Sequence, residues 1–183
     1  MTTKRLVCIT VAAFAVAGCS TIGKSVGGGD GGPPRNLVTT QADCPDSFTK
    51  GDVDGCSTSV CPIPVNLVWD GKACQVIVGA QIIKMAKGHN DALLRWWLPN
   101  GSKWEFREES SLFALPINFT NQSAPGLRDQ FQDRNVVANG KAVHLKNRNT
   151  NKEKYEYQIR VFKQDGGPND FIESTDPVIY NDF

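Results

Sequence analysis

The chain has 183 residues, of which 20 are basic and 19 are acidic, and its formal net charge is +1. This balance excludes the strongly positive surface on which nucleic-acid binding depends. The 6 cysteines are too many to be incidental and bear on the compartment in which the protein folds.

The first residues have the order of a secretory signal. Lys4 and Arg5 form a basic start, residues 6–17 form an apolar run, and the small residue Gly18 precedes Cys19. A run of this length is too short to cross a bilayer, which needs about 20 apolar residues. Residues 1–18 are therefore predicted to be a signal peptide.

The tetrapeptide Val16-Ala17-Gly18-Cys19 resembles the lipobox of bacterial lipoproteins. The resemblance implies cleavage before Cys19 and acyl chains on its sulfur and amino group, which together anchor a protein firmly. Ser20 is not the aspartate that retains enteric lipoproteins in the inner membrane. The resemblance thus implies the outer membrane and a domain on its periplasmic face. The alternatives are a surface-exposed domain and a secreted protein with an incidental Cys19.

Residues 19–36 are rich in glycine and then proline, with few apolar side chains. Such a segment buries too little apolar area to offset its chain entropy, so we expect a flexible tether. Residues 37–183 are then long enough for a single domain of ordinary size.

Four further cysteines cluster between residues 43 and 74. An even number in an exported domain predicts two disulfides, and three pairings are open. A zinc site is the alternative, but no two of these cysteines have the tight spacing that such sites use. We expect the disulfides to staple this segment, which has few periodic apolar residues. The cysteines are Cys44, Cys56, Cys61 and Cys74.

Short apolar or alternating runs, typical of β-strands, follow one another along the chain. Asp70-Gly71 and Asn139-Gly140 are hairpin-turn dipeptides, and Pro116 marks an edge or bulged strand. Residues 126–133 are predicted as a helical turn or a loop. The predicted strands are 64–69, 74–78, 81–85, 92–98, 103–107, 111–119, 136–137, 141–147, 154–163 and 178–180.

The clearest of these strands is 154–163. Tyr155, Tyr157, Ile159 and Val161 all fall on one face, as a half-buried strand requires. Many short strands with turns every 8–15 residues predict an all-β fold. We expect an antiparallel Greek-key β-sandwich of about 7–9 strands with a disulfide-stapled N-terminal segment.

Residues 74–182 resemble immunoglobulin-like and cupredoxin-like sandwiches. The resemblance lies in Lys87-Gly88 before Leu94-Arg95-Trp96-Trp97, the Tyr-x-Tyr-x-Ile-x-Val strand and the closing Asp176-Pro177-Val178-Ile179. Cupredoxins bind copper through two histidines, a cysteine and usually a methionine, with the cysteine and one histidine in the last loop. Residues 164–177 contain neither, and the histidines are His89 and His144. We expect no copper and no other cofactor.

Acid–base chemistry has one candidate group, at the end of the 103–107 strand: Glu105, Glu108 and Glu109. Two carboxylates across a cleft, about 5–9.5 Å apart, would suit a glycan-acting hydrolase. The Gly-x-Ser-x-Gly and Ser-x-x-Lys spacings of nucleophilic hydrolases occur once each, at Gly23–Gly27 in the predicted tether and at Ser47–Lys50 in the cysteine-rich segment. Neither follows a predicted strand, as the nucleophile turn of such enzymes requires, so neither is interpreted as a catalytic motif. The sequence favours a non-enzymatic protein and keeps the hydrolase as the alternative.

The candidate partner-binding residues are Trp96, Trp97 and Trp104. Neighbours in a strand point to opposite faces, so either Trp96 or Trp97 leaves the core, and an exposed tryptophan can anchor a partner. The predicted function is a binding or assembly module, held on a membrane by the lipid on Cys19. Its expected partner is another envelope protein or the cell-wall glycan, and not nucleic acid.

Overall fold

The computed structural model describes residues 37, 39–44, 56, 58–108, 117–121, 124, 126–175 and 177–182. The lipobox, Cys19 and the tether at residues 19–36 lie outside these ranges. All described residues belong to the compact unit Gly31–Phe183. Neither helix in this part of the chain has the length and apolar character needed to span a membrane. The helices are η1 (Gln41–Asp43) and α1 (Leu127–Gln130).

Eleven strands make up most of the described residues, and three of them have only two or three residues. They are β1 (Val60–Trp69), β2 (Cys74–Val78), β3 (Ile82–Met85), β4 (Ala92–Trp97), β5 (Trp104–Glu105), β6 (Ile117–Phe119), β7 (Phe131–Val137), β8 (Ala142–Asn147), β9 (Lys154–Lys163), β10 (Phe171–Glu173) and β11 (Val178–Asn181).

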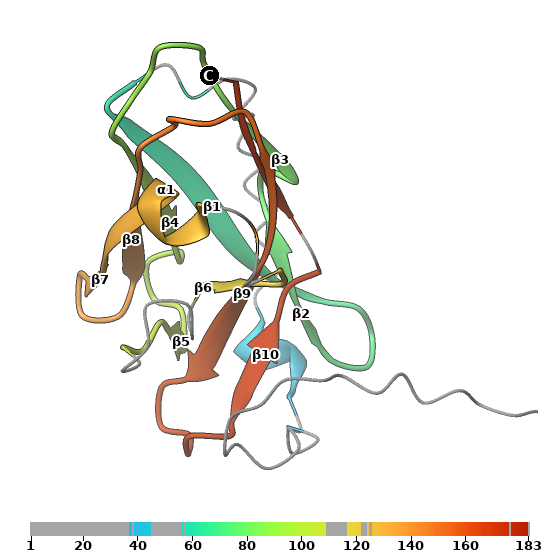
Figure 1. Cartoon of the computed structure of the whole chain (residues 1–183). Helices are drawn as coiled ribbons and strands as arrows, with labels where there is room; N and C mark the ends of the chain where they lie inside the picture. The colour runs from blue at the N-terminus through green and yellow to red at the C-terminus, as the bar shows by residue number, and fades with distance from the viewer. Residues whose placement is uncertain are drawn as a thin grey trace, which may run out of the picture. The chain divides into compact units, whose positions relative to one another are not determined.

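The strands form two sheets that enclose one core (Figure 1). The first sheet has the order β2-β1-β4-β8-β7. The second has the order β10-β9-β11-β3, with β5 and β6 also paired to β9. The chain passes repeatedly from one sheet to the other, and each sheet buries alternate residues against its neighbour. The predicted all-β sandwich is confirmed.

Two of the nine strand pairings among the described residues are parallel, and the other seven are antiparallel. β1 pairs in parallel with β4, and β11 pairs in parallel with β3. Strands joined by a hairpin must be antiparallel, whereas parallel neighbours need a longer connection. Here those connections run through the opposite sheet, so the sheets are mixed.

Strand β1 begins four residues before the strand predicted from the sequence, although Pro62 and Pro64 have no backbone N–H to donate. Both prolines are tolerated because they face the edge of the strand at which no backbone N–H is needed for pairing. The Leu93 N–H donates to the Ser59 carbonyl over 2.9 Å, and the parallel ladder then turns residues 61 and 63 toward β4. Pro62 and Pro64 therefore face the other edge, where β2 pairs only from Val65 onward.

The core is built around large aromatic side chains from both sheets. Trp96 of β4 and Tyr157 of β9 are both 0% exposed, and their rings meet edge to face at 5.4 Å. The Trp96 indole N–H donates to the Tyr157 hydroxyl over 3.1 Å, and burial raises the pKa of that hydroxyl. This contact joins the two sheets by a polar bond inside an apolar core.

Both predicted disulfides are present, and the pairing is now defined. Cys44 pairs with Cys74, and Cys56 pairs with Cys61, with Cα–Cα distances of 5.8 and 5.7 Å. The first disulfide joins η1 to β2. The Trp104 indole N–H joins η1 to β5 as well, by donating to the Asp43 carbonyl over 2.9 Å.

We expect the two disulfides to contribute unequally to stability. Cys44–Cys74 closes a loop with a sequence separation of 30, and Cys56–Cys61 closes one with a separation of 5. Loop-closure entropy then predicts losses in the free energy of unfolding of about 3.5 and about 2 kcal/mol, respectively. Paired Cys→Ser variants in denaturant unfolding would measure both losses. A Cys56–Cys61 variant that loses more than the Cys44–Cys74 variant would contradict this ranking.

Candidate functional site

The structure separates the three candidate tryptophans. Trp96 and Trp104 are 0% exposed and belong to the core, so they offer no surface to a partner. Trp97 lies on the opposite face of β4 and is half-buried at the surface. The alternation of β4 buries Ala92, Leu94 and Trp96, which places Trp97 outside. The partner-binding prediction is therefore restricted to Trp97.

Trp97 lies beside a shallow hollow on the outer face of the first sheet, here called the Trp97 hollow. The register places Pro62 opposite Arg95 and Pro64 opposite Trp97. On the other side of β4, Arg95 is opposite His144 and Trp97 is opposite Ala142. The hollow has a volume of about 230 Å³. It is lined by Pro62, Arg95, Trp97, Leu98, Asn100, Ala138, Lys141 and Ala142.

The charge in the Trp97 hollow is positive. Arg95 is exposed and makes no ion pair or hydrogen bond with any residue that the structure describes. Lys141 is already engaged, because its ammonium donates to the Ser102 carbonyl over 2.8 Å and to the Trp104 carbonyl. Burial lowers the pKa of Lys141. No carboxylate is among the lining residues, so Arg95 is the group that is free to bind an anion.

His144 lies opposite Arg95 on the neighbouring strand, in surroundings that disfavour its charged form. Its Nε2 atom is buried and has no hydrogen-bond partner in the described part of the chain. Burial, and then the nearby charge of Arg95, lower the pKa of His144 from its usual 6.5. The next outward residue of β8, Lys146, is paired with Asp91 over 3.2 Å. The free positive charge on this face is therefore that of Arg95.

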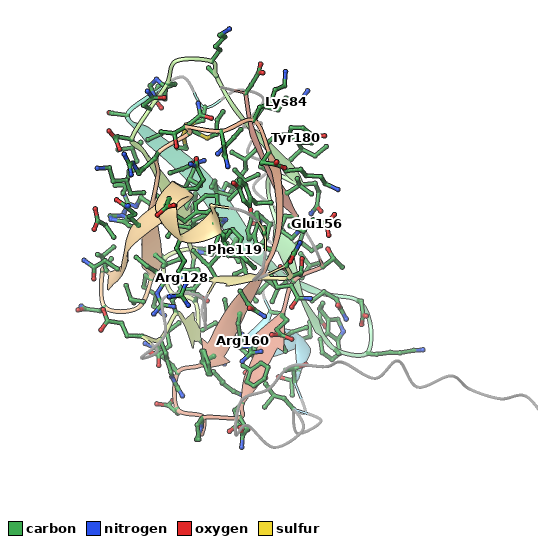
Figure 2. The ribbon with its side chains drawn as sticks, in the orientation of Figure 1. Lys84, Phe119, Arg128, Glu156, Arg160 and Tyr180 are labelled. Atoms are coloured by element: carbon green, nitrogen blue, oxygen red, sulfur yellow. A yellow bond between two sulfur atoms is a disulfide. The ribbon has the colours of Figure 1, made fainter. Side chains whose placement is uncertain are left out.

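A second surface, which the sequence did not predict, lies on the outer face of the other sheet. The parallel pairing of β3 with β11 places Ile82 opposite Val178 and Lys84 opposite Tyr180. Ile82 is 48% exposed and Tyr180 is 44% exposed, although both are large apolar side chains. Figure 2 shows Lys84 and Tyr180 near each other along one side of the domain.

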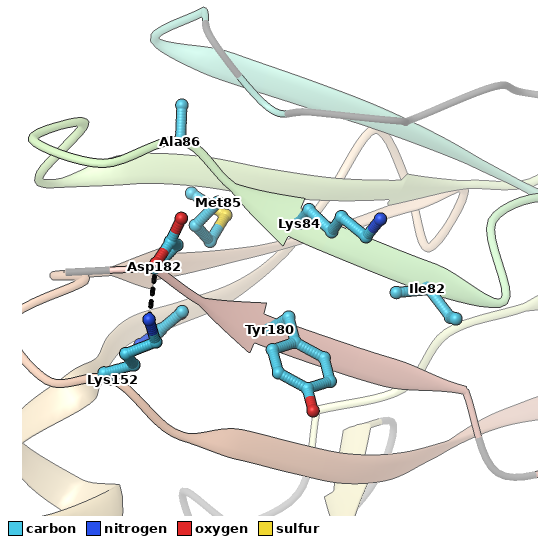
Figure 3. A pocket seen from close by; sticks show the side chains of 8 residues that line it. Ile82, Lys84, Met85, Ala86, Lys152, Tyr180 and Asp182 are labelled. Atoms are coloured by element: carbon cyan, nitrogen blue, oxygen red, sulfur yellow. Dashed lines mark ion pairs between the residues drawn. The ribbon is translucent and has the colours of Figure 1, made fainter.

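These side chains border a groove of about 420 Å³, here called the Tyr180 groove (Figure 3). Lys152 and Asp182 pair across one end of it over 3.3 Å. Lys84, in contrast, has no ion pair within the described ranges. The groove is thus mostly apolar, with one free cation at its rim. Its lining residues are Ile82, Lys84, Met85, Ala86, Lys152, Tyr180, Asn181 and Asp182.

The floor of the Tyr180 groove is held by buried amides. The Asn147 amide donates to Asn181 Oδ1 over 2.8 Å, and the Asn181 amide donates to Gln130 Oε1 over 3.1 Å. These contacts join β8 of the first sheet, β11 of the second sheet and the helix α1. All three side chains are at most 2% exposed, so the groove is built on a rigid end of the domain.

The predicted acidic residues do not gather into one site among the residues described. Glu105 pairs with Arg107 over 2.8 Å, and Arg107 also donates to the Lys163 carbonyl over 2.8 Å. Glu105 thus helps to hold the turn after β9. Glu108 is exposed, and Glu109 lies outside the described residues.

The described residues contain no group of three or more His, Cys, Asp or Glu side chains arranged to hold a metal ion. His89 lies in the turn after β3, where its Nε2 atom is 2.6 Å from the Thr58 carbonyl. His144 lies on β8, in a different part of the fold.

No protein-family model matches the chain, and the curated proteins contain no match to it. The two surfaces are therefore interpreted from their own chemistry.

His144 predicts a pH dependence of stability. Its folded pKa is lowered below 6.5, so the unfolded chain binds more protons just below that pH. The free energy of unfolding should therefore fall as the pH falls through 6.5 toward the folded pKa. His144→Gln should flatten this fall in denaturant unfolding between pH 5 and 7.5, and His89→Gln is the matched control. A fall that His144→Gln leaves unchanged would contradict this origin.

Proposed function

We propose that the protein is a lipid-anchored, non-enzymatic binding module of the bacterial envelope, which holds another envelope protein in the Tyr180 groove. The anchor is supported by the lipobox ending in Cys19, and an exported location is supported by the two disulfides. The observation that carries the proposal is that Ile82 and Tyr180, diagonal neighbours on the paired strands β3 and β11, are both exposed and line the same groove.

The Tyr180 groove has the composition of a protein-binding surface. Its centre is apolar and aromatic, and its rim is charged, which is the usual anatomy of an interface. Its volume of about 420 Å³ falls within the usual range of ligand-binding pockets, about 300–1,000 Å³. Tyrosine is also among the residues that most often dominate binding energy. A folded domain gains nothing by leaving two large apolar side chains in water, whereas a partner would bury both.

The chemistry of the rim indicates what the partner carries. Lys84 is a free cation next to Ile82 and Tyr180, and the Lys152–Asp182 pair neutralises the other end. The complementary segment is an apolar side chain with an acidic residue beside it. Such charge complementarity contributes mainly to specificity and to the rate of association.

The anchor has its own test. Intact-mass measurement of the protein purified from detergent-solubilised envelopes should show loss of residues 1–18 and a gain of two or three acyl chains on Cys19. Cys19→Ser should remove the acyl mass and release the protein from the membrane fraction. A mature protein without acyl chains would refute the anchor and leave the two surfaces unaffected.

The groove is tested by site-specific cross-linking in the envelope of the source bacterium. A photoreactive benzoyl-phenylalanine in place of Tyr180 should cross-link one envelope protein, whereas the same residue in place of the exposed Lys72 should not. Ile82→Ser should weaken binding of the purified cross-linked partner about 30-fold, the effect of losing an interface residue worth about 2 kcal/mol. Lys84→Glu should also weaken it. Equal cross-linking from both positions, or a partner insensitive to both substitutions, would refute the proposal.

A further inference from the structure

We infer that the Trp97 hollow binds a sugar ring that carries a carboxylate. The hollow and the Tyr180 groove lie on the outer faces of different sheets and share no residue. This inference therefore stands independently of the protein partner proposed for the groove.

Trp97 supplies the platform for the ring. Its indole is half-buried at the end of β4, and its strand neighbour Trp96 is locked in the core by Tyr157. The backbone from which the Trp97 side chain extends is thus held by strand pairing on both sides. Small or flat neighbours, Pro62, Ala138 and Ala142, leave space above the sheet. The C–H face of a pyranose packs well against an aromatic face, and indole has the largest such face of any side chain.

Arg95 supplies the contact for the carboxylate. It precedes Trp97 by two residues in β4, so both side chains leave the same face of the sheet about 7 Å apart. A guanidinium binds a carboxylate through two parallel hydrogen bonds. Arg95 has no such partner within the described residues. Lys141 is held by the Ser102 carbonyl and adds positive charge without competing for the same place.

The remaining groups favour a sugar over the side chain of a protein. The volume of ≈ 230 Å³ is below the range of pockets for drug-sized ligands, so it suits one ring. The hollow lies where the first sheet meets the residues that follow β4. The Asn100 side chain at its edge can donate to and accept from hydroxyl or acetamido groups. An aspartate or glutamate side chain of a protein could pair with Arg95, but it has no ring that would pack against Trp97.

The inference is tested with two sugars that differ in one group. N-acetylmuramic acid and N-acetylglucosamine share the ring and the acetamido group, and only the first has a carboxylate. The full-length protein in detergent, labelled at its indole nitrogens, should show a shift of the Trp97 N–H signal in NMR spectra on titration with N-acetylmuramic acid. N-acetylglucosamine should bind about tenfold more weakly, the value of one charge-assisted pair.

Substitutions separate the two contacts. Arg95→Gln should abolish the preference for the carboxylate while residual ring binding remains, and Trp97→Leu should abolish binding of both sugars. Lys72→Ser, at an exposed position in the turn between β1 and β2 that lines neither surface, is the control and should change neither affinity. All three positions are at the surface, so the folded state of each variant can be checked by its unfolding curve.

Tighter binding of glucuronic acid than of N-acetylmuramic acid would support an acidic sugar and assign it to a polysaccharide outside the cell wall. Equal affinity for the two N-acetyl sugars would refute the role of Arg95. N-acetyl-aspartyl amide binding as tightly as the acidic sugars would refute the sugar and identify a protein carboxylate instead. Saturating sugar without a Trp97 shift would refute the site.

Discussion

The contact between Trp96 and Tyr157 is the interaction on which the rest of the domain depends. It joins β4 of one sheet to β9 of the other through a hydrogen bond of 3.1 Å between two fully buried rings. A buried indole N–H without an acceptor would cost about 1–3 kcal/mol, so the core favours the arrangement that keeps Trp96 beside the Tyr157 hydroxyl. Because β4 alternates, the same contact turns Arg95 and Trp97 outward. The alternation of side chains along β4 thus accounts both for the buried Trp96 contact and for the outward side chains of the proposed sugar site.

The features that could be predicted from sequence are those with a local cause. The alternation of Tyr155, Tyr157, Ile159 and Val161 identified β9, because a half-buried strand repeats every two residues. Asn139-Gly140 identified the hairpin between β7 and β8, because both residues adopt the positive φ that its turn requires. The even number of cysteines indicated two disulfides. Their pairing stayed open, because it depends on which segments meet in space.

The features that could not be predicted depend on contacts between distant segments. Ile82 and Tyr180 form one groove only because β3 and β11 pair in parallel, and neither short strand shows this in its own pattern. The sequence also showed that Trp96 or Trp97 must leave the core without showing which one. The structure buries Trp96, which lies on the face of β4 that also carries Ala92 and Leu94, and its N–H donates to the Tyr157 hydroxyl. Strand β10 was missed because its three residues lie in a segment rich in turn residues.

The placement of the two proposed sites has a consequence for how such a module would act. Their side chains leave the outer faces of two sheets that pack about 10 Å apart, so a ligand on one face does not block the other. Sites that share no side chain bind with nearly additive free energies. A sugar at Arg95 and Trp97 and a protein at Ile82 and Tyr180 would therefore be held together by one domain. The proposed lipid on Cys19 would restrict the domain to a layer beside the membrane, where weak contacts on both faces would act at high effective concentration. Millimolar affinities at each surface would suffice to hold both ligands in that layer. Two small surfaces such as these are suited to affinities of that order.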